Sequence, residues 1–261
     1  MRLLKRYKTY ILPSFIFLML LWGSAIITQV ELHTLFAGIP RGVNLLLSMF
    51  PPDLSVMPEL LYPALETVQI AFVGTVLGIC IALFVGMFAA SNVNKNRILR
   101  EITRGLLSAE RALPDLIVLL FFVTIVGLGA FPGVMGLAFS SLGMLGKLFA
   151  DAIEEIDPRP SEAIAAVGAT RLQIIRFAIL PQVWPSLIAN SLFRFEINIR
   201  ASIFLGVVGA GGIGFNLIMH MRQLEYQQAM SAILVILFMV VICERISDVL
   251  RKRIIGAEVL K

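Results

Sequence analysis

Charge is scarce in this chain of 261 residues. Only 15% of the residues are Asp, Glu, Lys or Arg, whereas 58% are hydrophobic. This composition excludes an ordinary soluble domain, in which about a quarter of the residues are charged. No polar stretch is long enough to fold by itself. The composition therefore predicts an integral membrane protein with one membrane domain over residues 1–261.

Reactive and metal-binding residues are also few. Cys80 and Cys243 both lie in apolar runs, which excludes a disulfide scaffold and predicts inert buried thiols. His33 and His220 are far apart and belong to no cluster with ligand spacing, so no metal site is expected. No Ser/His/Asp arrangement stands out, so no catalytic residue is predicted. No phosphate-binding loop G-x-x-x-x-G-K-[ST] occurs, and we expect this chain to bind neither ATP nor another cofactor.

Long apolar runs predict an all-α polytopic membrane bundle with six transmembrane helices, because a span needs about 20 residues. The predicted spans are residues 11–30, 64–90, 112–131, 133–150, 183–208 and 228–243. For the first run, a cleaved signal peptide competes with an uncleaved helix. Glycines and serines dilute the fourth run, for which a re-entrant loop is the alternative.

The distribution of basic residues predicts the topology. Eighteen of the 22 Lys and Arg residues fall on the N-terminus, residues 91–111, residues 147–181 and the tail from residue 244. Six spans place all four segments on one side, and only Arg41 and Arg222 on the other. The positive-inside rule assigns the basic side to the cytoplasm. We therefore expect a multi-pass protein of the prokaryotic cytoplasmic (inner) membrane with both termini cytoplasmic, and basic residues that serve topology rather than nucleic-acid binding.

Residues 157–181 are the one long polar-to-amphipathic interruption. They read as two short helices, with Ser161 and Thr170 suited to cap them. Gly168 stands between the helices, where a left-handed backbone is favoured. Pro181 is expected to stop the second helix. We interpret this cytoplasmic elbow as a docking surface rather than a reaction centre.

Four polar residues, Arg194, Glu196, Asn198 and Arg200, fall within the fifth predicted span. Ionisable groups there cost ~2.5–3.5 kcal/mol on insertion scales and usually face a polar interior. Glu196 and Arg200 have the i, i+4 spacing of an ion pair. Two hypotheses follow: Arg194 or Arg200 lines a path for an oxyanion, or the charges hold the bundle or two copies of the chain together.

A glycine-rich stretch follows the same span. Gly209, Gly211 and Gly214 spell G-x-G-x-x-G, with Gly212 between them. A dinucleotide site needs this motif after a β-strand, whereas here it follows a membrane span. We predict a flexible outer turn or gate, whose amides can contact an anion in transit. Glu66, near the outer end of the second span, is a further candidate for the path.

The elbow resembles the EAA signature of importer permeases of the ATP-binding-cassette (ABC) type. The residues that carry the resemblance are Glu162, Ala163, Gly168, Leu180 and Pro181. The spacing matches, with the glycine six residues after the glutamate. Two positions depart from the pattern: Ile164 replaces the usual alanine and Ala178 the usual isoleucine.

Longer stretches resemble one branch, the permeases of phosphonate uptake systems. These stretches are ALETVQIAFVGT (64–75), RALPDLIVLLFF (111–122), GKLFADAIEEID (146–157), FRFEINIRASIFLG (193–206) and VVGAGGIGFNL (207–217). The resemblance covers roughly residues 64–248 and is weak before residue 60.

The resemblance implies a complex of two permease copies, two cytoplasmic ATPase subunits that bind ATP and Mg, and an external solute-binding protein. The elbow is then the coupling helix in a groove of the ATPase. Glu162 would meet ATPase groups, Ala163 and Ala165 would permit close approach, and Gly168 would set the elbow angle. The alternative for this segment is a plain pair of interfacial helices.

The function expected from this resemblance is import of phosphonate-like oxyanions (phosphonate, phosphate or phosphite) by alternating access coupled to the partner ATPase. A permease for methionine or another small solute is the alternative within the class. A passive channel would leave the elbow unexplained. A membrane-embedded enzyme acting on lipid would lack a nucleophile or metal cluster.

Overall fold

The computed structural model describes the backbone of residues 2–259, and the side chains of all of these except 2–9, 11–12, 32 and 255–259. These residues form helices joined by short turns, and no strand occurs among them. The predicted all-α fold class is confirmed. The chain separates into two compact units, one ending at Phe50 and the other beginning at Pro51.

The first unit contains two helices, α1 (Arg2–Ile27) and α2 (Leu32–Ser48). α1 covers most of the first predicted span. Its described apolar side chains are exposed, for example Phe17 at 64% and Trp22 at 67%. This is the pattern of a helix whose side chains contact lipid or another chain rather than a core of their own.

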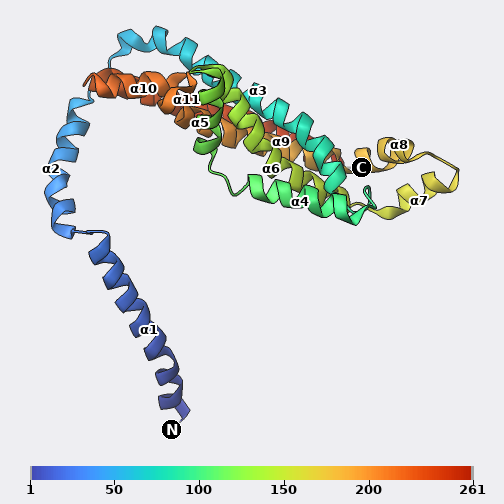
Figure 1. The fold of residues 1–261 in the computed structure, drawn as a ribbon. Coiled ribbons are helices and arrows are strands. Elements are labelled where there is room, and N and C mark those ends of the chain that lie inside the picture. Colours follow the sequence, from blue (N-terminus) through green and yellow to red (C-terminus); the bar gives the residue numbers. More distant parts are fainter. Residues whose placement is uncertain (1, 260–261) are drawn as a thin grey trace. The chain divides into compact units, whose positions relative to one another are not determined.

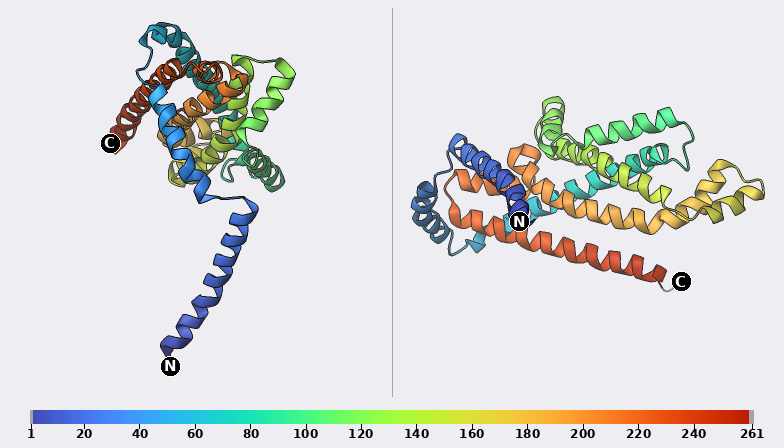
Figure 2. Two further views of the ribbon diagram at one scale, coloured as in Figure 1. Left: turned by 90° about the vertical axis from the view of Figure 1, so that its left-hand side faces the viewer. Right: turned by 90° about the horizontal axis from the view of Figure 1, so that it is seen from below.

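The second unit is a helical bundle, drawn in Figure 1 and from two further sides in Figure 2. Its elements are η1 (Leu54–Val56), α3 (Met57–Ala89), α4 (Arg97–Glu110), α5 (Asp115–Val126), α6 (Ala130–Glu154), α7 (Pro158–Ala166), α8 (Arg171–Ile174), the π-helical turn η2 (Ile175–Ile179), α9 (Leu180–Leu205), the π-helical turn η3 (Gly206–Ala210), α10 (Ile213–Arg222) and α11 (Tyr226–Val259).

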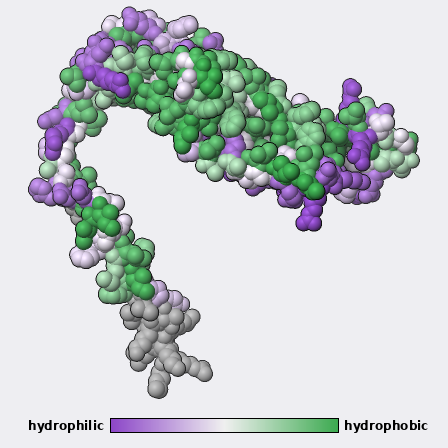
Figure 3. Space-filling view, viewed as in Figure 1, coloured by the Kyte–Doolittle hydropathy of each residue, from purple (hydrophilic) through white to green (hydrophobic). Residues whose placement is uncertain are grey.

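Four helical segments are long and apolar enough to cross a membrane. They are Leu54–Ala89, Ala130–Glu154, Arg171–Ala210 and Tyr226–Ile254. Each coincides with one predicted span. The other two predicted spans coincide with shorter apolar helices, so the count of six stays a prediction. Figure 3 shows apolar surface over the middle of the bundle and hydrophilic residues gathered towards its ends.

A tight turn separates α5 from α6. Gly127 and Gly129 have φ angles of 94° and 131°, which side chains rarely adopt, and these two glycines let the chain reverse. Beyond the turn, α6 is one helix of 25 residues. The fourth predicted span is therefore a continuous helix and not a re-entrant loop.

α3 is the central helix of the bundle. Its residues belong to all three buried apolar clusters, which join it to α6, to α9 and to α10 and α11. Glycines on α3 bring α6 unusually close. A Cβ atom built on Gly78 would lie 2.5 Å from the Cβ of Ser141, and one on Gly74 would lie 2.8 Å from that of Leu137. Small residues one turn apart thus permit backbone contact, as the spacing predicts.

The bundle has two distinct ends. α7 and α8 lie at one end, and α10 lies at the other together with the turn between α5 and α6 (Figure 1). α9 continues the elbow directly into the bundle, where it packs against α3, α6 and α11. This placement carries Arg194 and Asn198 of α9 into the interior.

We predict that Gly78→Ala destabilises the bundle by about 1–3 kcal/mol, because the added methyl group overlaps Ser141 and forces α3 away from α6. Thermal unfolding of the detergent-purified protein measures the effect. Gly105→Ala on α4 is the matched control, because a Cβ added at Gly105 would meet nothing within 4 Å. The control is expected to be neutral or stabilising. Equal melting temperatures for both variants would contradict the close packing of α3 on α6.

Candidate functional site

The elbow consists of α7, Gly168, α8 and η2. Asp157 caps α7, with Oδ1 accepting from the amide of Arg159 at 3.0 Å. The cap is therefore Asp157 and not Ser161, because α7 begins four residues earlier than the sequence pattern indicates. Side-chain hydrogen bonds from Arg159 also hold the pKa of Asp157 below its usual value. The carboxylate is therefore charged at neutral pH, and the cap weakens only as the pH falls through this lowered pKa.

Gly168 forms the corner of the elbow. Its φ of 84° is the left-handed conformation predicted for the end of the first helix. The second helix starts at Thr170, whose amide donates to Gln173 Oε1 at 2.7 Å. Thr170 therefore caps the second helix as predicted, and Gln173 completes a capping box.

Pro181 does not stop the helix. It lies in the first turn of α9, directly after the π-helical turn η2, and helical structure continues from Arg171 to Ala210. Proline is tolerated in a first turn, where its missing N–H needs no partner, and the wider π turn accommodates the change of hydrogen-bond register. The second half of the elbow, from Arg171 onward, is therefore continuous with α9.

The tip of the elbow is exposed and partly apolar. The predicted coupling residues Glu162, Ala163, Ala165, Gly168 and Pro181 are all exposed, and Leu180 is half-buried. Three large apolar side chains stand out beside them: Val167 at 85%, Leu172 at 79% and Phe177 at 60% exposure. Val167 and Phe177 line a shallow hollow of about 440 Å³ at the corner. Apolar side chains grouped at a polar end of a protein indicate a binding surface for another protein.

A buried polar cluster lies inside the bundle around Arg194. This side chain is only 5% exposed. Its Nη2 donates to Ser140 Oγ at 2.8 Å and its Nε to Ser141 Oγ at 3.0 Å. Ser140 donates in turn to Asp115. A buried guanidinium needs such partners, because an unpaired charge in a medium of low polarity costs several kcal/mol.

Asn198 extends this cluster to α3. Its Nδ2 donates to Thr75 Oγ1 and to Ser141 Oγ, both at 2.8 Å, and the side chain is fully buried. Arg194 and Asn198 thus share the interior face of α9, as their spacing of four residues predicts. Together they join α9 to α6 and α3.

Two acidic residues lie near Arg194. Asp115 opens α5 and Glu110 ends α4, and a negative charge on either side chain attracts the guanidinium. Burial raises the pKa of Glu110 to about 7, so this side chain carries only part of a negative charge at neutral pH. Glu110 fits because residue 143 is glycine: a Cβ on Gly143 would overlap its carboxylate oxygen. Sequence reasoning missed both carboxylates as partners of Arg194. The sequence does carry one signal for them. Pro114 separates two helical patterns, and such a break marks a point where an acidic side chain can enter the bundle.

The predicted ion pair between Glu196 and Arg200 does not form. Glu196 accepts from Arg251 Nη2 at 2.6 Å, and Arg200 pairs with Glu244. Both partners lie on α11, because that helix packs along this side of α9 and offers opposite charges at matching heights. The charges of α9 do hold helices of the bundle together, as one of the two hypotheses states. They do so through ion pairs between helices and not through an i, i+4 pair.

The glycine turn is built into a junction of three helices. Gly209, Gly211 and Gly212 have φ angles of 102°, 78° and 72°. The amide of Gly212 donates to Glu66 Oε2 at 2.8 Å. The amide of Gly129 donates to the carbonyl of Gly209 at 3.0 Å, which ties the turn to the start of α6. Glu66 thus accepts the hydrogen bond of one of the backbone amides that we expected to contact an anion.

Gly214 has a packing role in the same junction. A Cβ there would lie 1.9 Å from the carbonyl oxygen of Ile203, so only glycine lets α10 fold back against α9. The neighbouring amide of Ile213 donates to Thr67 Oγ1 at 2.9 Å. With these amides satisfied, the G-x-G-x-x-G stretch serves chain reversal, as its position after a membrane span predicts.

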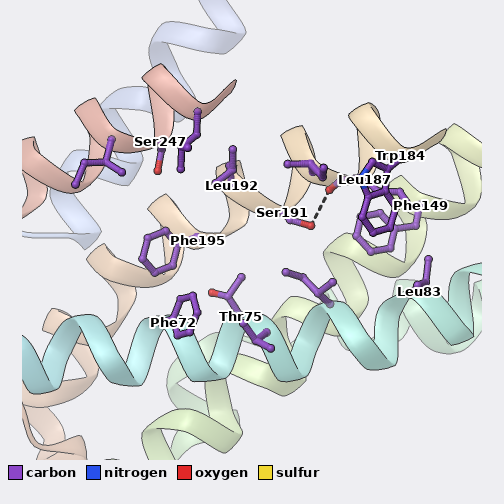
Figure 4. Close-up of a pocket in the computed structure, with 15 residues that line it drawn as sticks. Phe72, Thr75, Leu83, Phe149, Trp184, Leu187, Ser191, Leu192, Phe195 and Ser247 are labelled. Atoms are coloured by element: carbon purple, nitrogen blue, oxygen red, sulfur yellow. Dashed lines mark hydrogen bonds between the residues drawn. The ribbon is translucent and has the colours of Figure 1, made fainter. Parts of the chain in front are cut away.

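An apolar crevice of about 410 Å³ lies between α3, α6, α9 and α11 (Figure 4). Phe72, Phe149, Trp184 and Phe195 are among its lining residues. Of its two serines, Ser191 and Ser247, the first donates its hydroxyl to the carbonyl of Leu187 at 2.7 Å, the dashed line in Figure 4. The lining carries no charged residue and is mostly apolar, so the crevice suits an apolar group.

Metal-binding clusters are absent from the described part of the chain, where no group of three or more His, Cys, Asp or Glu residues converges. His220 instead contacts Glu225, with Nδ1 and Oε2 2.9 Å apart. The polar chemistry of the bundle is therefore ionic and hydrogen-bonding in character.

Comparison with known proteins gives a consistent family. The family model described as "Binding-protein-dependent transport system inner membrane component" matches residues 82–256. The phosphite transport system permease protein PtxC of Stutzerimonas stutzeri is 42% identical over 219 residues, covering 84% of this chain and 80% of that protein. The phosphate-import permease protein PhnE of Mycolicibacterium smegmatis is 37% identical over 231 residues, covering 88% of this chain and 43% of that protein.

A solved structure shares the fold. A chain of the MetNI methionine ABC transporter, in inward-facing conformations, superposes with a TM-score of 0.68. The match covers 77% of this chain and 99% of that chain, at 23% sequence identity. At this identity the likeness shows the fold and carries no statement about the solute.

We predict that Ser141→Ala destabilises the protein by about 1–3 kcal/mol, because it leaves Arg194 Nε without its hydroxyl acceptor and removes one of the two acceptors of Asn198. The matched control is Ser191→Ala, whose hydroxyl bonds only to its own helix backbone. We expect the control to be close to neutral. The midpoint of thermal unfolding in detergent measures both, and a neutral Ser141→Ala would contradict the assigned network.

Proposed function

Because this chain belongs to the family of inner membrane components of binding-protein-dependent transport systems, we propose that it is the permease subunit of an ATP-driven importer for phosphonate-like oxyanions. The observation that carries the proposal is the exposed elbow continuous with α9. The relatives named above, permeases for phosphite and for phosphate, support the solute class. The chain itself is a transport component of the membrane.

Coupling to ATP falls to a partner in this proposal. ATP and Mg bind to a separate cytoplasmic ATPase, of which two copies serve the complex. Glu162, Ala163, Ala165 and Gly168 face solvent at the elbow, where the ATPase can approach. The exposed apolar side chains beside them supply the desolvated centre that a stable protein interface needs.

The continuity of the elbow with α9 supports a mechanical role. The corner at Gly168 is fixed by a backbone hydrogen bond to Ala165 at 3.0 Å and by the capping box that follows. From Arg171 onward the chain is helical as far as Ala210. A rigid-body movement of the ATPase is therefore delivered to α9 and to the helices packed on it, as alternating access requires.

A second permease copy completes the membrane part of the proposal. The pair of Arg200 and Glu244 is half-exposed, with 51% and 41% of the two side chains accessible. Charges on membrane helices face other protein or a water-filled cavity rather than hydrocarbon. This side of α9 and α11 is therefore assigned to the contact with the second copy and to the path between the copies.

The path residues divide by their surroundings. Arg194 and Asn198 are buried in the interior network, Glu196 is held by Arg251, and Glu66 is held at the glycine turn. Arg200 is the arginine of α9 with accessible donors. We assign it the contact with the oxyanion, and we assign the other four positions to the frame of the path.

An external solute-binding protein delivers the solute in this proposal. The elbow and both termini then face the cytoplasm, and the end with α10 and the glycine turn faces the binding protein. The distribution of basic residues supports this orientation. Methionine import, the alternative within the class, is less well supported, because the methionine transporter shares the fold at only 23% identity.

The test of the solute class is uptake by the assembled complex in proteoliposomes, with ATP on the cytoplasmic side. We expect ATP-dependent uptake of phosphite, phosphate or methylphosphonate, mutual competition among these anions, and no competition by methionine. A complex that imports methionine and none of the three oxyanions would refute the proposal. Transport that persists without any ATPase would refute the ATP-driven mechanism and favour a channel.

We predict that Leu172→Ser together with Phe177→Ser abolishes co-purification of the ATPase while the permease still folds. Both side chains are exposed, so their removal costs the fold within about 0.5 kcal/mol. Removing apolar groups from the centre of an interface weakens binding at least about tenfold. The control is Leu224→Asn, which changes a residue of 68% exposure outside the elbow. If the elbow variant retained the ATPase as the control does, the docking surface would lie elsewhere.

A further inference from the structure

An ion pair between Arg200 of α9 and Glu244 of α11 lies at the surface of the bundle. We propose that this pair is an exchange site: Glu244 holds the guanidinium between transport events, and the transported oxyanion takes its place on Arg200 during transport. The inference rests on the proposed function and adds Glu244 as the competitor of the solute. The sequence places Glu244 at the start of the cytoplasmic tail, so the structure alone brings it to this position.

The depth of the pair in the bundle is the first argument. Arg200 lies two residues beyond Asn198, whose amide reaches both Thr75 and Ser141. Thr75 is central in α3, which spans 33 residues, and Ser141 is central in α6, which spans 25. The ion pair therefore lies near mid-height of the membrane helices. Half-exposed charges at that depth need water or protein beside them.

The surroundings of Arg200 are the second argument. Phe193 and Phe204 lie on the same side of α9, seven residues before and four after Arg200, and are 43% and 57% exposed. Large apolar side chains thus flank the guanidinium along the helix. They lower the local polarity, so an anion that reaches Arg200 is attracted more strongly than it would be in bulk water.

The other described ion pair between α9 and α11, and the buried Arg194, are less accessible than Arg200 and Glu244. Arg194 is only 5% exposed and donates to Ser140 and Ser141 in the interior. Glu196 and Arg251 are 11% and 29% exposed, and Arg251 also approaches Asp248 at 3.8 Å. Arg200 and Glu244 are the more exposed of the two ion pairs between α9 and α11. We therefore assign the exchange with the solute to Arg200 and Glu244.

The chemistry of the guanidinium supports exchange. Its planar fork of N–H donors matches two oxygens of a carboxylate and two oxygens of a phosphonate or phosphate group equally well. Glu244 therefore occupies the position that the oxyanion would take. A transport site must also release its ligand, and an arginine without a competing carboxylate at this depth would release a dianion too slowly. Competition by Glu244 shortens the residence of the solute on Arg200.

The experiment compares three variants in the complete complex. Equilibrium binding of radiolabelled methylphosphonate is measured on the purified permease–ATPase complex without the binding protein, and uptake on the full system. We expect Glu244→Gln to bind methylphosphonate roughly three- to fivefold tighter, because it removes a partly exposed competing ion pair. Arg200→Gln is expected to lose binding and uptake. The double variant Arg200→Gln with Glu244→Gln is expected to follow Arg200→Gln.

A merely structural ion pair gives the opposite pattern. Each single variant would then leave one charge unpaired and impair assembly alike, and the double variant would restore transport. That result, or an unchanged affinity in Glu244→Gln, would overturn the proposal. The neighbouring pair provides the control, because Glu196→Gln and Arg251→Gln are expected to affect assembly without tightening the binding of methylphosphonate.

Two further measurements keep the test decisive. If Arg200→Gln does not assemble, Arg200→Lys takes its place, because lysine keeps the charge and lacks the planar fork of donors. Weaker binding of methylphosphonate is still expected for Arg200→Lys. An unchanged affinity would overturn the proposal. A wild-type complex that takes up none of phosphite, phosphate and methylphosphonate would refute the proposed function itself. Uptake by the wild type with equal affinities in Glu244→Gln would refute the exchange site alone.

Discussion

The rest of the bundle depends on keeping one guanidinium inside it. Arg194 is almost fully buried among membrane helices, where an unpaired charge would cost several kcal/mol. Serine hydroxyls of α6 accept its hydrogen bonds, and two acidic residues at the junction of α4 and α5 attract its charge. Satisfying one side chain thus fixes the relative positions of four helices. The requirement also explains the small residues nearby, because Gly143 leaves room for Glu110 and Gly78 brings α3 to Ser141.

Much of this architecture could be predicted from the sequence, because hydrophobic length, charge asymmetry and helix caps are local signals. The elbow, its corner at Gly168 and its capping box follow from residues within four positions of one another. The glycines of α3 predict a close neighbour by their spacing. The turn between α5 and α6 follows from the glycines that interrupt an apolar run of twice the span length.

The partners across the bundle could not be predicted in the same way. Arg200 and Glu244 are separated by 44 residues, and Glu196 and Arg251 by 55. The spacing of Glu196 and Arg200 suggested a local pair, but α11 supplies stronger, interhelical partners. Which end of α11 meets which turn of α9 depends on helix tilt and register, and these follow from packing over the whole interface. The prediction that Pro181 stops the helix was wrong for a related reason. A π turn precedes Pro181 and lets the helix continue, and the sequence pattern does not show this turn.

These contacts give α9 two different sides. One side, with Arg194 and Asn198, is tied to α3 and α6 by buried hydrogen bonds. The other side meets α11 through two ion pairs: the half-exposed pair of Arg200 and Glu244, which is easier to break and remake in water than a buried one, and the less exposed pair of Glu196 and Arg251. In the proposed function, a push on the elbow is therefore expected to move α9 together with α3 and α6. The half-exposed Arg200 lies where α9 meets α11, so a displacement that opens a path for the solute beside α9 is expected to change the distance between Arg200 and Glu244 as well.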